Sequence, residues 1–208
     1  MRIGYIGLGN LGGHMAMSLI RKDFSVTVHD RNQSLADRHV AAGAERAENA
    51  AVLAGACDVV MTCLPSPAVC EIVLSECLSA MRPGSIWIEN STLGRDEIVK
   101  LAAMAQAKGI RVLEAPVTGG VHLAARGEIT VLAGGEKVLF DEMTPVLEAI
   151  GNRLFHMGPI GSAAIIKVIT NMLAFIHLKA DAEALMLAKR GGLDLAQAWH
   201  AIKASSGN

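Results

Sequence analysis

The fold of this chain is decided by its first dozen residues, Met1-Arg2-Ile3-Gly4-Tyr5-Ile6-Gly7-Leu8-Gly9-Asn10-Leu11-Gly12. A short apolar strand leads into glycines at positions 7, 9 and 12, and helical periodicity follows. Glycines at this spacing allow a tight turn, close approach of a pyrophosphate to the backbone, and packing of the helix on the strand. The helix N-terminus presents N–H groups and a favourable dipole to phosphates. An ordinary strand–helix turn is the alternative. The stretch predicts a dinucleotide site formed by Gly7, Leu8, Gly9, Asn10, Leu11 and Gly12.

Beyond this unit, short apolar strands alternate with helical stretches. Strands are predicted at residues 2–6, 25–29, 59–64, 86–89, 111–114, 129–133 and 154–156. Helices are predicted at residues 11–22, 34–42, 68–81, 95–108 and 136–150. Alternation of this kind is typical of an α/β fold with a doubly wound parallel sheet that carries helices on both faces.

The pattern changes after Gly161. Residues 162–190 contain neither proline nor glycine, so they predict one long helix that ends at Gly191-Gly192. At the usual helical rise it is about 40 Å long. A second helix is predicted from Asp194 toward Ser205. Two helices cannot bury their own apolar faces. We therefore expect a dinucleotide-binding domain over residues 1–160 and the start of a truncated, all-helical domain over residues 161–208.

The composition argues against several classes of function. The 208 residues are 51% hydrophobic, which is enough for a full core, and the formal net charge of -1 argues against nucleic-acid or anionic-membrane partners. No apolar run approaches about 18 uncharged residues, and the N-terminus does not resemble a signal peptide. We therefore expect no membrane span and a cytoplasmic location. The cysteines lack zinc-type spacing and are expected to be reduced, buried thiols with no metal site. They are Cys57, Cys63, Cys70 and Cys77.

Polar residues follow further predicted strands. Asp30 ends the second strand, eighteen residues after the last glycine of the turn. A carboxylate there hydrogen-bonds an adenosine ribose and favours NAD. Arg31 keeps NADP as the alternative, because a guanidinium at this position holds a 2′-phosphate. The loops at residues 63–66 and 90–92 also follow strands, and ligands bind outside the carboxyl ends of strands in an open parallel sheet. Plain turn chemistry is the alternative for both loops.

Two polar features lie near the change of pattern. Lys167 and Asn171 stand four residues apart in an apolar helical segment, which puts the amine and the amide on one helix face. Burying an amine and an amide costs free energy unless they are hydrogen-bonded or take part in function. A lysine that follows a nucleotide-binding fold suggests a proton donor near a reacting carbonyl. A snorkelling lysine is the alternative. Upstream, Thr118-Gly119-Gly120 leave backbone N–H groups accessible to a carboxylate, with a flexible turn as the alternative.

Four segments in this order resemble the β-hydroxyacid dehydrogenase family, which includes 3-hydroxyisobutyrate dehydrogenase and tartronate semialdehyde reductase. They are residues 7–12, residues 115–127, residues 158–167, and the pair Lys167 and Asn171. The resemblance implies an N-terminal Rossmann domain, a long interdomain helix and a C-terminal helical domain. It implies that Lys167 is catalytic, that Thr118, Gly119, Gly120 and Asn171 bind substrate, and that Leu64, Pro65 and Thr92 contact cofactor.

The chain departs from the family pattern at several positions. Thr118 stands where serine is usual, Asn90 where aspartate is common, and Ala163 where glycine is usual. His122-Leu123 replace small residues. These changes bear on the identity of the substrate more than on the type of reaction.

The resemblance implies reversible hydride transfer between NAD, or alternatively NADP, and a small 3-hydroxy acid or its semialdehyde. The expected substrates are of the 3-hydroxyisobutyrate or the tartronate semialdehyde and glycerate type. Imine reductases, which usually lack the lysine, and phosphogluconate-type dehydrogenases, which need a basic cluster for phosphate, are related alternatives. A redox-silent dinucleotide-binding assembly module is an alternative of another class. The apolar surface of the helix at residues 162–190 predicts a homodimer or homotetramer.

Overall fold

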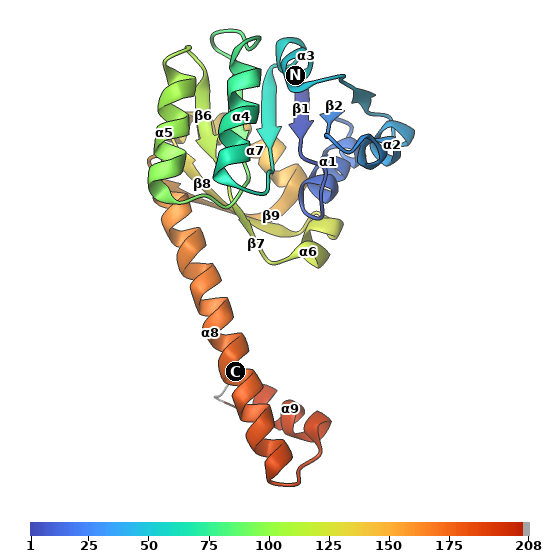
Figure 1. The fold of residues 1–208 in the computed structure, drawn as a ribbon, viewed down its shortest axis with the longest axis vertical. Coiled ribbons are helices and arrows are strands. Elements are labelled where there is room, and N and C mark those ends of the chain that lie inside the picture. Colours follow the sequence, from blue (N-terminus) through green and yellow to red (C-terminus); the bar gives the residue numbers. More distant parts are fainter. Residues whose placement is uncertain (206–208) are drawn as a thin grey trace. The chain divides into compact units, whose positions relative to one another are not determined.

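A computed structural model gives the structure of residues 1–205 (Figure 1). The chain forms two compact units, Met1–Val168 and a second unit that begins at Ile169. The first unit contains the β-sheet and its covering helices. The second unit consists of the later part of one long helix and the helix that follows it.

The elements alternate along the chain as predicted. The strands are β1 (Arg2–Ile6), β2 (Ser25–His29), β3 (Glu45–Arg46), β4 (Val59–Thr62), β5 (Ile86–Glu89), β6 (Arg111–Glu114), β7 (Val117–Thr118), β8 (Ile129–Gly135) and β9 (Gly151–Gly158). The helices are α1 (Gly12–Arg21), α2 (Gln33–Ala41), α3 (Ala50–Ala56), α4 (Pro67–Leu78), α5 (Arg95–Gln106), α6 (Val121–Arg126), α7 (Lys137–Ile150), α8 (Ser162–Arg190) and α9 (Leu195–Lys203). The α/β, Rossmann-type fold class is confirmed.

The sheet runs in the order β3-β2-β1-β4-β5-β6-β8-β7, with β9 paired to β8. The strands from β3 to β6 are parallel, and β1 lies between β2 and β4. The chain therefore leaves β1 toward one side and later returns to its other side. Open α/β sheets bind ligands at this kind of switch point. The register places Ile6 level with His29 and with Thr62, so the loops after these three strands emerge together.

The prediction of a parallel sheet is wrong beyond β6. Strand β8 pairs antiparallel with both β6 and β7, and only β9 lies parallel to β8. A parallel crossover needs about a dozen or more residues, usually with a helix that packs across the sheet. The link from β6 to β8 instead holds the 2-residue β7, which runs antiparallel to β8, and the 6-residue α6, which is shorter than a usual crossover helix.

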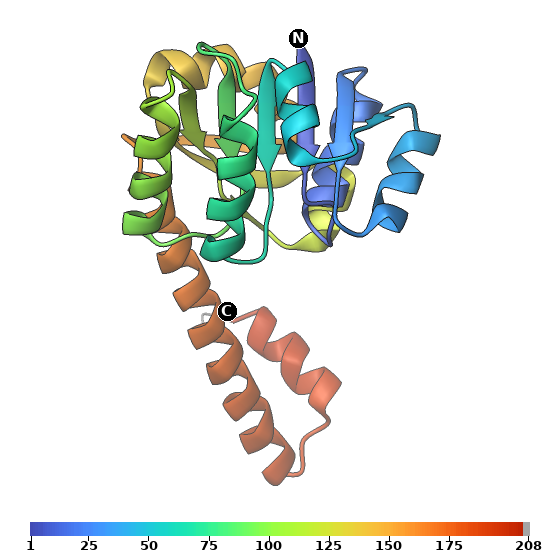
Figure 2. The same cartoon turned by 45° about the horizontal axis from the view of Figure 1, so that its top comes forward.

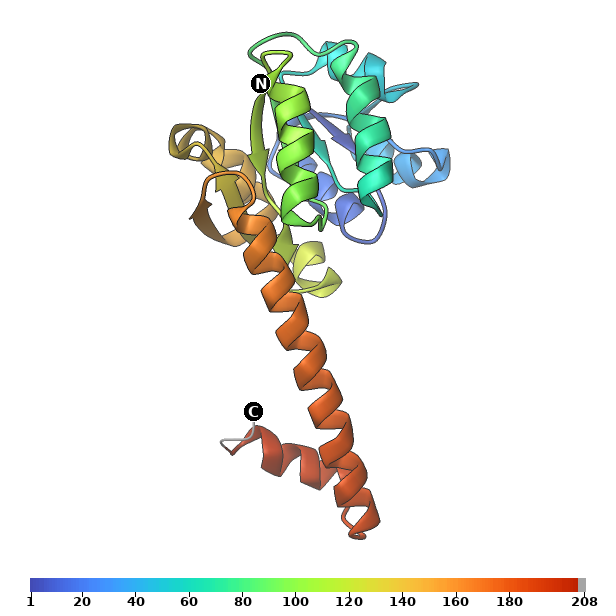
Figure 3. The same cartoon turned by 60° about the vertical axis from the view of Figure 1, so that its left-hand side comes forward.

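Helices cover both faces of the sheet (Figure 2). On one face, Met15 of α1 and Met143 of α7 pack against inward side chains of the strands. On the other face, Leu53 of α3, Leu74 of α4 and Leu101 of α5 form a second core cluster. Figure 3 shows α4 and α5 side by side on that face. Burial from both sides explains why β4 and β5 are buried at every residue.

Four short elements were not predicted from the sequence, namely β3, α3, β7 and α6. Helix α3 has 7 residues and begins where the side chain of Asn49 accepts a hydrogen bond from the N–H of Val52 at 2.8 Å. Helix α6 has 6 residues and ends at Gly127, whose φ is +72°. Elements of this length are stabilised by caps and tertiary packing, so hydrophobic periodicity does not reveal them.

Helix α8 has 29 residues and begins and ends where the sequence predicted. By length and composition alone it could cross a membrane, since one 18-residue window has a mean hydropathy of 1.5 with 17% of the window buried. We expected no membrane span because the sequence lacks a long run of uncharged residues. An average of hydropathy over a window, by contrast, allows a few charged residues within it. Core helices of soluble proteins also meet this criterion, so it is weak evidence for a span. The two compact units divide within α8, after Val168, and the domain boundary between residues 160 and 161 stays a prediction.

The cysteines are free thiols, and three of them are buried as expected. Burial raises the pKa of Cys70 and of Cys77 to about 12, so both remain protonated near neutral pH. Cys63 is only partly buried, which differs from the expectation. It follows β4 at the carboxyl edge of the sheet, where a cavity opens.

Candidate functional site

A cavity of about 690 Å³ opens at the switch point, beside the carboxyl ends of β1, β2 and β4. Helices α3 and α4 also contribute side chains, which the sequence could not indicate because it does not show how these helices pack. The predicted cofactor residues that line the cavity are Gly7, Gly9, Asn10, Leu11, Gly12, Asp30, Arg31, Leu64 and Pro65. Cys63 of the predicted loop at residues 63–66 also lines it, and the lining residues that were not predicted are Ile6, His29, Ala50, Val69, Ile72, Val73 and Glu76.

The glycine-rich turn leaves open space where a ligand would approach. Gly7 has a φ of +94°, and a Cβ on Gly12 would lie 2.0 Å from the carbonyl oxygen of Gly7. A Cβ on Gly9 would meet no protein atom within 4 Å. Gly7 and Gly12 are therefore required by the protein's own conformation and packing. No contact within the protein requires glycine at position 9, so the space there is open to a molecule that approaches the backbone, as a pyrophosphate would.

Asp30 fastens the glycine turn and also faces the cavity. Its Oδ2 accepts a hydrogen bond from the N–H of Leu8 at 2.7 Å, and its Oδ1 accepts one from the N–H of Asn32 at 2.8 Å. Each carboxylate oxygen has a further acceptor position that remains available to a ribose hydroxyl. The side chain of Leu8 is buried in the core and does not line the cavity. Leu8 thus supports the turn from inside.

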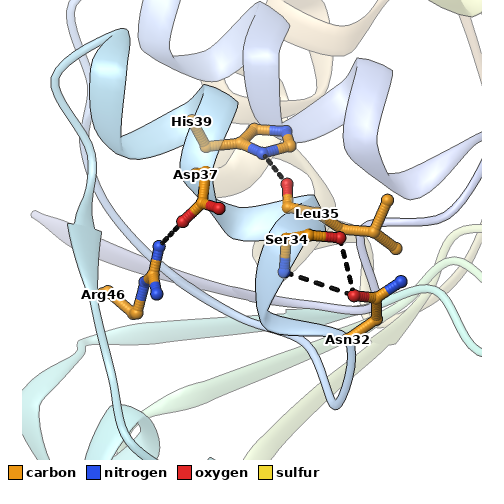
Figure 4. Close-up of polar contacts among 6 residues, drawn as sticks. All are labelled: Asn32, Ser34, Leu35, Asp37, His39 and Arg46. Carbon is orange, nitrogen blue, oxygen red and sulfur yellow. Dashed lines mark hydrogen bonds and ion pairs between the residues drawn. The ribbon is translucent and has the colours of Figure 1, made fainter.

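The residues after β2 hold the adjoining loop in shape (Figure 4). The Oδ1 of Asn32 accepts hydrogen bonds from the N–H of Ser34 at 3.2 Å and from its hydroxyl at 2.7 Å, which caps α2. Further along, Asp37 forms an ion pair with Arg46 of β3. Arg31 is exposed on this loop and lines the cavity beside the carboxylate at position 30. The loop therefore presents one negative and one positive group to the cavity.

A buried carboxylate ties the other two loops together. Glu89, the last residue of β5, is 1% exposed and accepts hydrogen bonds from the N–H of Ser91 at 2.6 Å and from the hydroxyl of Thr62 at 2.8 Å. The hydroxyl of Ser91 accepts a hydrogen bond from the N–H of Leu64 at 2.7 Å. Burial raises the pKa of Glu89, and its hydrogen bonds counteract that rise. Thr92 is exposed and does not line the cavity. Its predicted contact with the cofactor therefore stays a prediction.

Asn90 is adapted to its surroundings in this chain. It is 2% exposed, its Nδ2 donates to the carbonyl oxygen of Ala115 at 2.8 Å, and its Oδ1 accepts from the hydroxyl of Tyr5 at 3.3 Å. Both ends of the amide are therefore used. An aspartate here would lose the donor to Ala115, which explains why this chain carries asparagine.

The loop after β7 exposes its backbone. Gly119 and Gly120 have φ values of +122° and +83°, which favour glycine, and both residues are exposed. A Cβ on Gly119 would lie 2.6 Å from Cδ1 of Leu123, so the leucine that replaces a small residue packs closely on this turn. Thr118 is half-buried and pairs with Thr130 of β8. The N–H groups of the turn remain accessible to a carboxylate.

Lys167 lies in the second turn of α8. Its side chain is 8% exposed, and it is the one buried lysine or arginine among residues 1–205. Burial lowers the pKa of Lys167 from its ordinary value. Asn171 is half-buried one helical turn later and belongs to the second compact unit. A snorkelling lysine keeps its charged group in water, and the low exposure of Lys167 differs from that pattern, while its role stays a prediction.

Two family models together match almost the whole chain. Residues 2–158 match the NAD binding domain of 6-phosphogluconate dehydrogenase. Residues 161–208 match the NAD-binding region of NADP-dependent 3-hydroxyisobutyrate dehydrogenase. The second match includes all of α8.

Several characterised proteins are similar over the full length of the chain. The 2-(hydroxymethyl)glutarate dehydrogenase of Eubacterium barkeri is 33% identical over 210 residues, covering 100% of this chain and 70% of the relative. The NAD-dependent L-serine dehydrogenase of Pseudomonas aeruginosa is 34% identical over 209 residues, covering 99% and 70%. The structure of Mycobacterium tuberculosis 3-hydroxyisobutyrate dehydrogenase with L-serine superposes with a TM-score of 0.92 at 31% identity, covering 100% of this chain and 71% of the other.

A Rossmann sheet with a glycine cradle at its switch point, matched by NAD-binding models, defines a nicotinamide-dependent oxidoreductase. More narrowly, the chain belongs to the β-hydroxyacid dehydrogenase family, and the resemblance seen in the sequence is confirmed. The cofactor is NAD or NADP. The roles of individual residues stay predictions.

Replacing Gly9 and Gly12 separately tests which glycine serves the ligand. We expect Gly9→Ala to melt like the parent chain, because its Cβ meets no protein atom within 4 Å, while its affinity for the dinucleotide falls. A fall of about tenfold corresponds to about 1.4 kcal/mol. Gly12→Ala is the contrasting variant: its Cβ would strike a backbone oxygen, so we expect a loss of stability of about 1–3 kcal/mol.

Thermal melting and a fluorescence titration with NAD and NADP measure both effects. Normal cofactor binding by a well-folded Gly9→Ala variant would contradict the placement of the pyrophosphate.

Proposed function

We propose that this chain transfers a hydride reversibly between a nicotinamide cofactor and a small 3-hydroxy acid. The observation that carries the proposal is Lys167, a buried lysine at the start of the helix that follows a complete dinucleotide fold. Burial lowers the pKa of this amine, which moves it toward the range that suits proton transfer near neutral pH.

The dinucleotide is proposed to lie along the cavity at the switch point. Gly9 offers open space for the pyrophosphate, and the N-terminus of α1 offers free N–H groups. Asp30 and Arg31 would face the adenosine ribose, and Leu64 and Pro65 would line the opposite wall. When bound, the nicotinamide ring supplies the hydride acceptor for oxidation or the donor for reduction.

Lys167 is proposed to move the proton. In the oxidation direction, its neutral Nζ accepts the proton of the substrate hydroxyl. In the reduction direction, its ammonium form donates a proton to the carbonyl oxygen. Asn171, four residues later on the same helix, would orient the amine or hold substrate without adding a charge. Arginine could not replace the lysine, because a guanidinium does not give up its proton near neutral pH.

The substrate class follows from the chemistry that the relatives share. Their names specify 2-(hydroxymethyl)glutarate, L-serine and 3-hydroxyisobutyrate, and each carries a hydroxyl on the carbon β to a carboxylate. In this chain, Thr118 and the N–H groups of Gly119 and Gly120 are proposed to bind that carboxylate. Holding it would present the β carbon for reaction, which is positioning catalysis. Acids of the 3-hydroxyisobutyrate and glycerate types, and their semialdehydes, are the proposed substrates.

The related alternatives differ in one testable respect. A phosphogluconate-type enzyme would require a phosphorylated substrate, and an imine reductase would act on a carbon–nitrogen bond. A redox-silent binding module would bind the dinucleotide and turn over no hydroxy acid. A panel of 3-hydroxy acids, 6-phosphogluconate and a cyclic imine, followed by nicotinamide absorbance, separates these outcomes. We propose a cytoplasmic location, in keeping with the similarity to the bacterial dehydrogenases of Eubacterium barkeri and Pseudomonas aeruginosa.

Cofactor preference provides a test of Asp30. We propose NAD as the preferred cofactor, because a carboxylate repels a 2′-phosphate. Asp30→Asn keeps one oxygen for the backbone N–H donors but removes the charge, so the ratio of NAD to NADP affinity should fall by about tenfold, or about 1.4 kcal/mol. Arg31→Ala is the matched variant and should weaken NADP selectively. Tighter binding of NADP by the parent chain, or an unchanged ratio in Asp30→Asn, would assign the choice to Arg31.

Assembly provides a second test. Large apolar side chains of α8 beyond the first unit are exposed, including Met172, Leu173, Phe175, Ile176 and Leu178 at 43–71%. Exposure of this extent marks an interaction surface, so we propose a homodimer or homotetramer. Sedimentation velocity across a range of concentrations should show self-association, and a monomer at every concentration would refute it.

Lys167 provides the main kinetic test. Lys167→Ala should lower turnover at least about a hundredfold, which is typical of losing a general acid–base group. Lys167→Arg should not restore it. Affinity for the dinucleotide should change little in either variant. Near-normal turnover in Lys167→Ala would return the residue to the snorkelling alternative.

The pH dependence of the rates in the two directions provides an independent test of the role of Lys167. Oxidation needs the neutral amine, so its rate should rise with pH through the pKa of Lys167, whereas reduction needs the ammonium form and should decline through the same pKa. Because burial lowers that pKa, both midpoints should lie below the ordinary lysine value of about 10.4. Initial rates in both directions across pH measure this. Profiles that change in the same direction would contradict the assignment.

A further inference from the structure

We propose that Glu114 is a positioning residue whose buried side chain holds the first turn of α8 against the carboxyl end of β6 and thereby places Lys167. This inference rests on the proposed function for its kinetic consequence. The geometry on which it stands lies within the first compact unit, and it does not depend on the identity of the substrate.

The carboxylate of Glu114 meets three backbone donors at the start of α8. Its Oε1 accepts hydrogen bonds from the N–H of Gly161 at 2.5 Å and of Ala163 at 3.0 Å, and its Oε2 accepts one from the N–H of Ala164 at 3.2 Å. The first N–H groups of a helix have no partner within the helix, and the helix dipole favours an anion there. Glu114 therefore satisfies these donors from another element of the fold.

The surrounding backbone leaves room for this side chain. Gly134 of β8 is the register partner of Glu114, and a Cβ on Gly134 would lie 2.2 Å from the Oε1 of Glu114. Gly161 has a φ of +95°, which turns the chain so that its N–H can reach the same oxygen. Two glycines far apart in sequence thus accommodate one carboxylate.

The position of Lys167 follows from this attachment. Ala163 is four residues before Lys167, so the two lie on the same face of α8, and both are buried. Ala163 and Ala164 are bound to Glu114 through their N–H groups, and Ala164 also packs in the core cluster beside α5. A shift of the first turn would therefore carry the amine with it. A displacement of about 1 Å in a reacting group can cost about a hundredfold in rate.

Because the carboxylate of Glu114 is buried, it must keep its hydrogen bonds to the start of α8. Glu114 is 1% exposed, and desolvation raises its pKa while the three N–H donors oppose the rise. An unpaired buried charge would be strongly destabilising, so the helix start must remain in place to satisfy it. Glutamine at this position would aim an NH₂ group at backbone N–H donors. Its amide oxygen could serve only part of the set.

A matched control exists in the same unit. Glu97 also closes a helix start, because its Oε2 accepts a hydrogen bond from the N–H of Gly94 at 2.6 Å at the beginning of α5. That residue is exposed and α5 carries none of the proposed catalytic groups. Glu97→Gln therefore makes the same chemical change at a helix start where the carboxylate binds the N–H of Gly94 and not the start of α8.

The experiment compares the parent chain with Glu114→Gln, Glu114→Asp and Glu97→Gln. The first readout is the pH dependence of acylation of the Lys167 amine, followed by mass spectrometry, which needs no turnover. We expect the midpoint to shift in Glu114→Gln, because the surroundings of the displaced amine change, and to stay unchanged in Glu97→Gln. Hydrogen exchange at residues 161–167 should quicken in Glu114→Gln and stay unchanged in Glu97→Gln. Glu114→Asp, which keeps the charge, should lie between.

The second readout is the kinetic split. Turnover in Glu114→Gln should fall about tenfold or more with NAD affinity nearly unchanged, and Glu114→Asp should recover part of the loss. If Glu114→Gln does not fold, the acylation midpoint, hydrogen exchange and turnover of Glu114→Asp test the proposal instead. An unchanged acylation midpoint and unchanged turnover in folded Glu114 variants would overturn the proposal. If the parent chain oxidises no hydroxy acid, the proposed function fails, while the acylation and exchange results still decide the positioning role.

Discussion

The carboxyl edge of this sheet depends on the burial of two carboxylates on adjacent strands. Glu89 and Glu114 are register partners on β5 and β6, each is 1% exposed, and both line one void of about 10 Å³. Buried charges are costly unless donors surround them, so the backbone around each must adopt a shape that supplies those donors. Around Glu89 this fixes the loops after β4 and β5. Around Glu114 it fixes the start of α8.

The glycine turn after β1 is held in a similar way beside the cavity. Asp30 accepts the N–H of Leu8 while it lines the cavity, so under the proposed function one side chain would serve both the shape of the glycine turn and the choice of cofactor. The exposed Arg31 and the start of α2, which Asn32 caps, complete this part of the structure. Three carboxylates, at positions 30, 89 and 114, thus shape the edge where parallel α/β sheets bind ligands.

Much of the fold could be predicted from the sequence because its signals are local. The strand–glycine–helix opening and the long run without proline or glycine are read directly from residue order, and α8 begins and ends where predicted. The antiparallel β8 and the short α3 and α6 depend on caps and packing, which periodicity does not encode. Most predicted cofactor residues line one cavity, but Leu8 is turned into the core and Thr92 lies outside the lining. Glu89 and Glu114 were read only as strand ends, although a carboxylate that closes an apolar strand was an available signal.

A crystal structure of the chain with NAD tests the central claim that this edge is the cofactor site. The account predicts the pyrophosphate beside Gly9 at the N-terminus of α1, with a ribose hydroxyl hydrogen-bonded to Asp30. It also predicts that Glu89 and Glu114 keep their present backbone partners, because the edge is already formed. A dinucleotide bound outside the cavity, or bound there only after these carboxylates release their N–H donors, would contradict it.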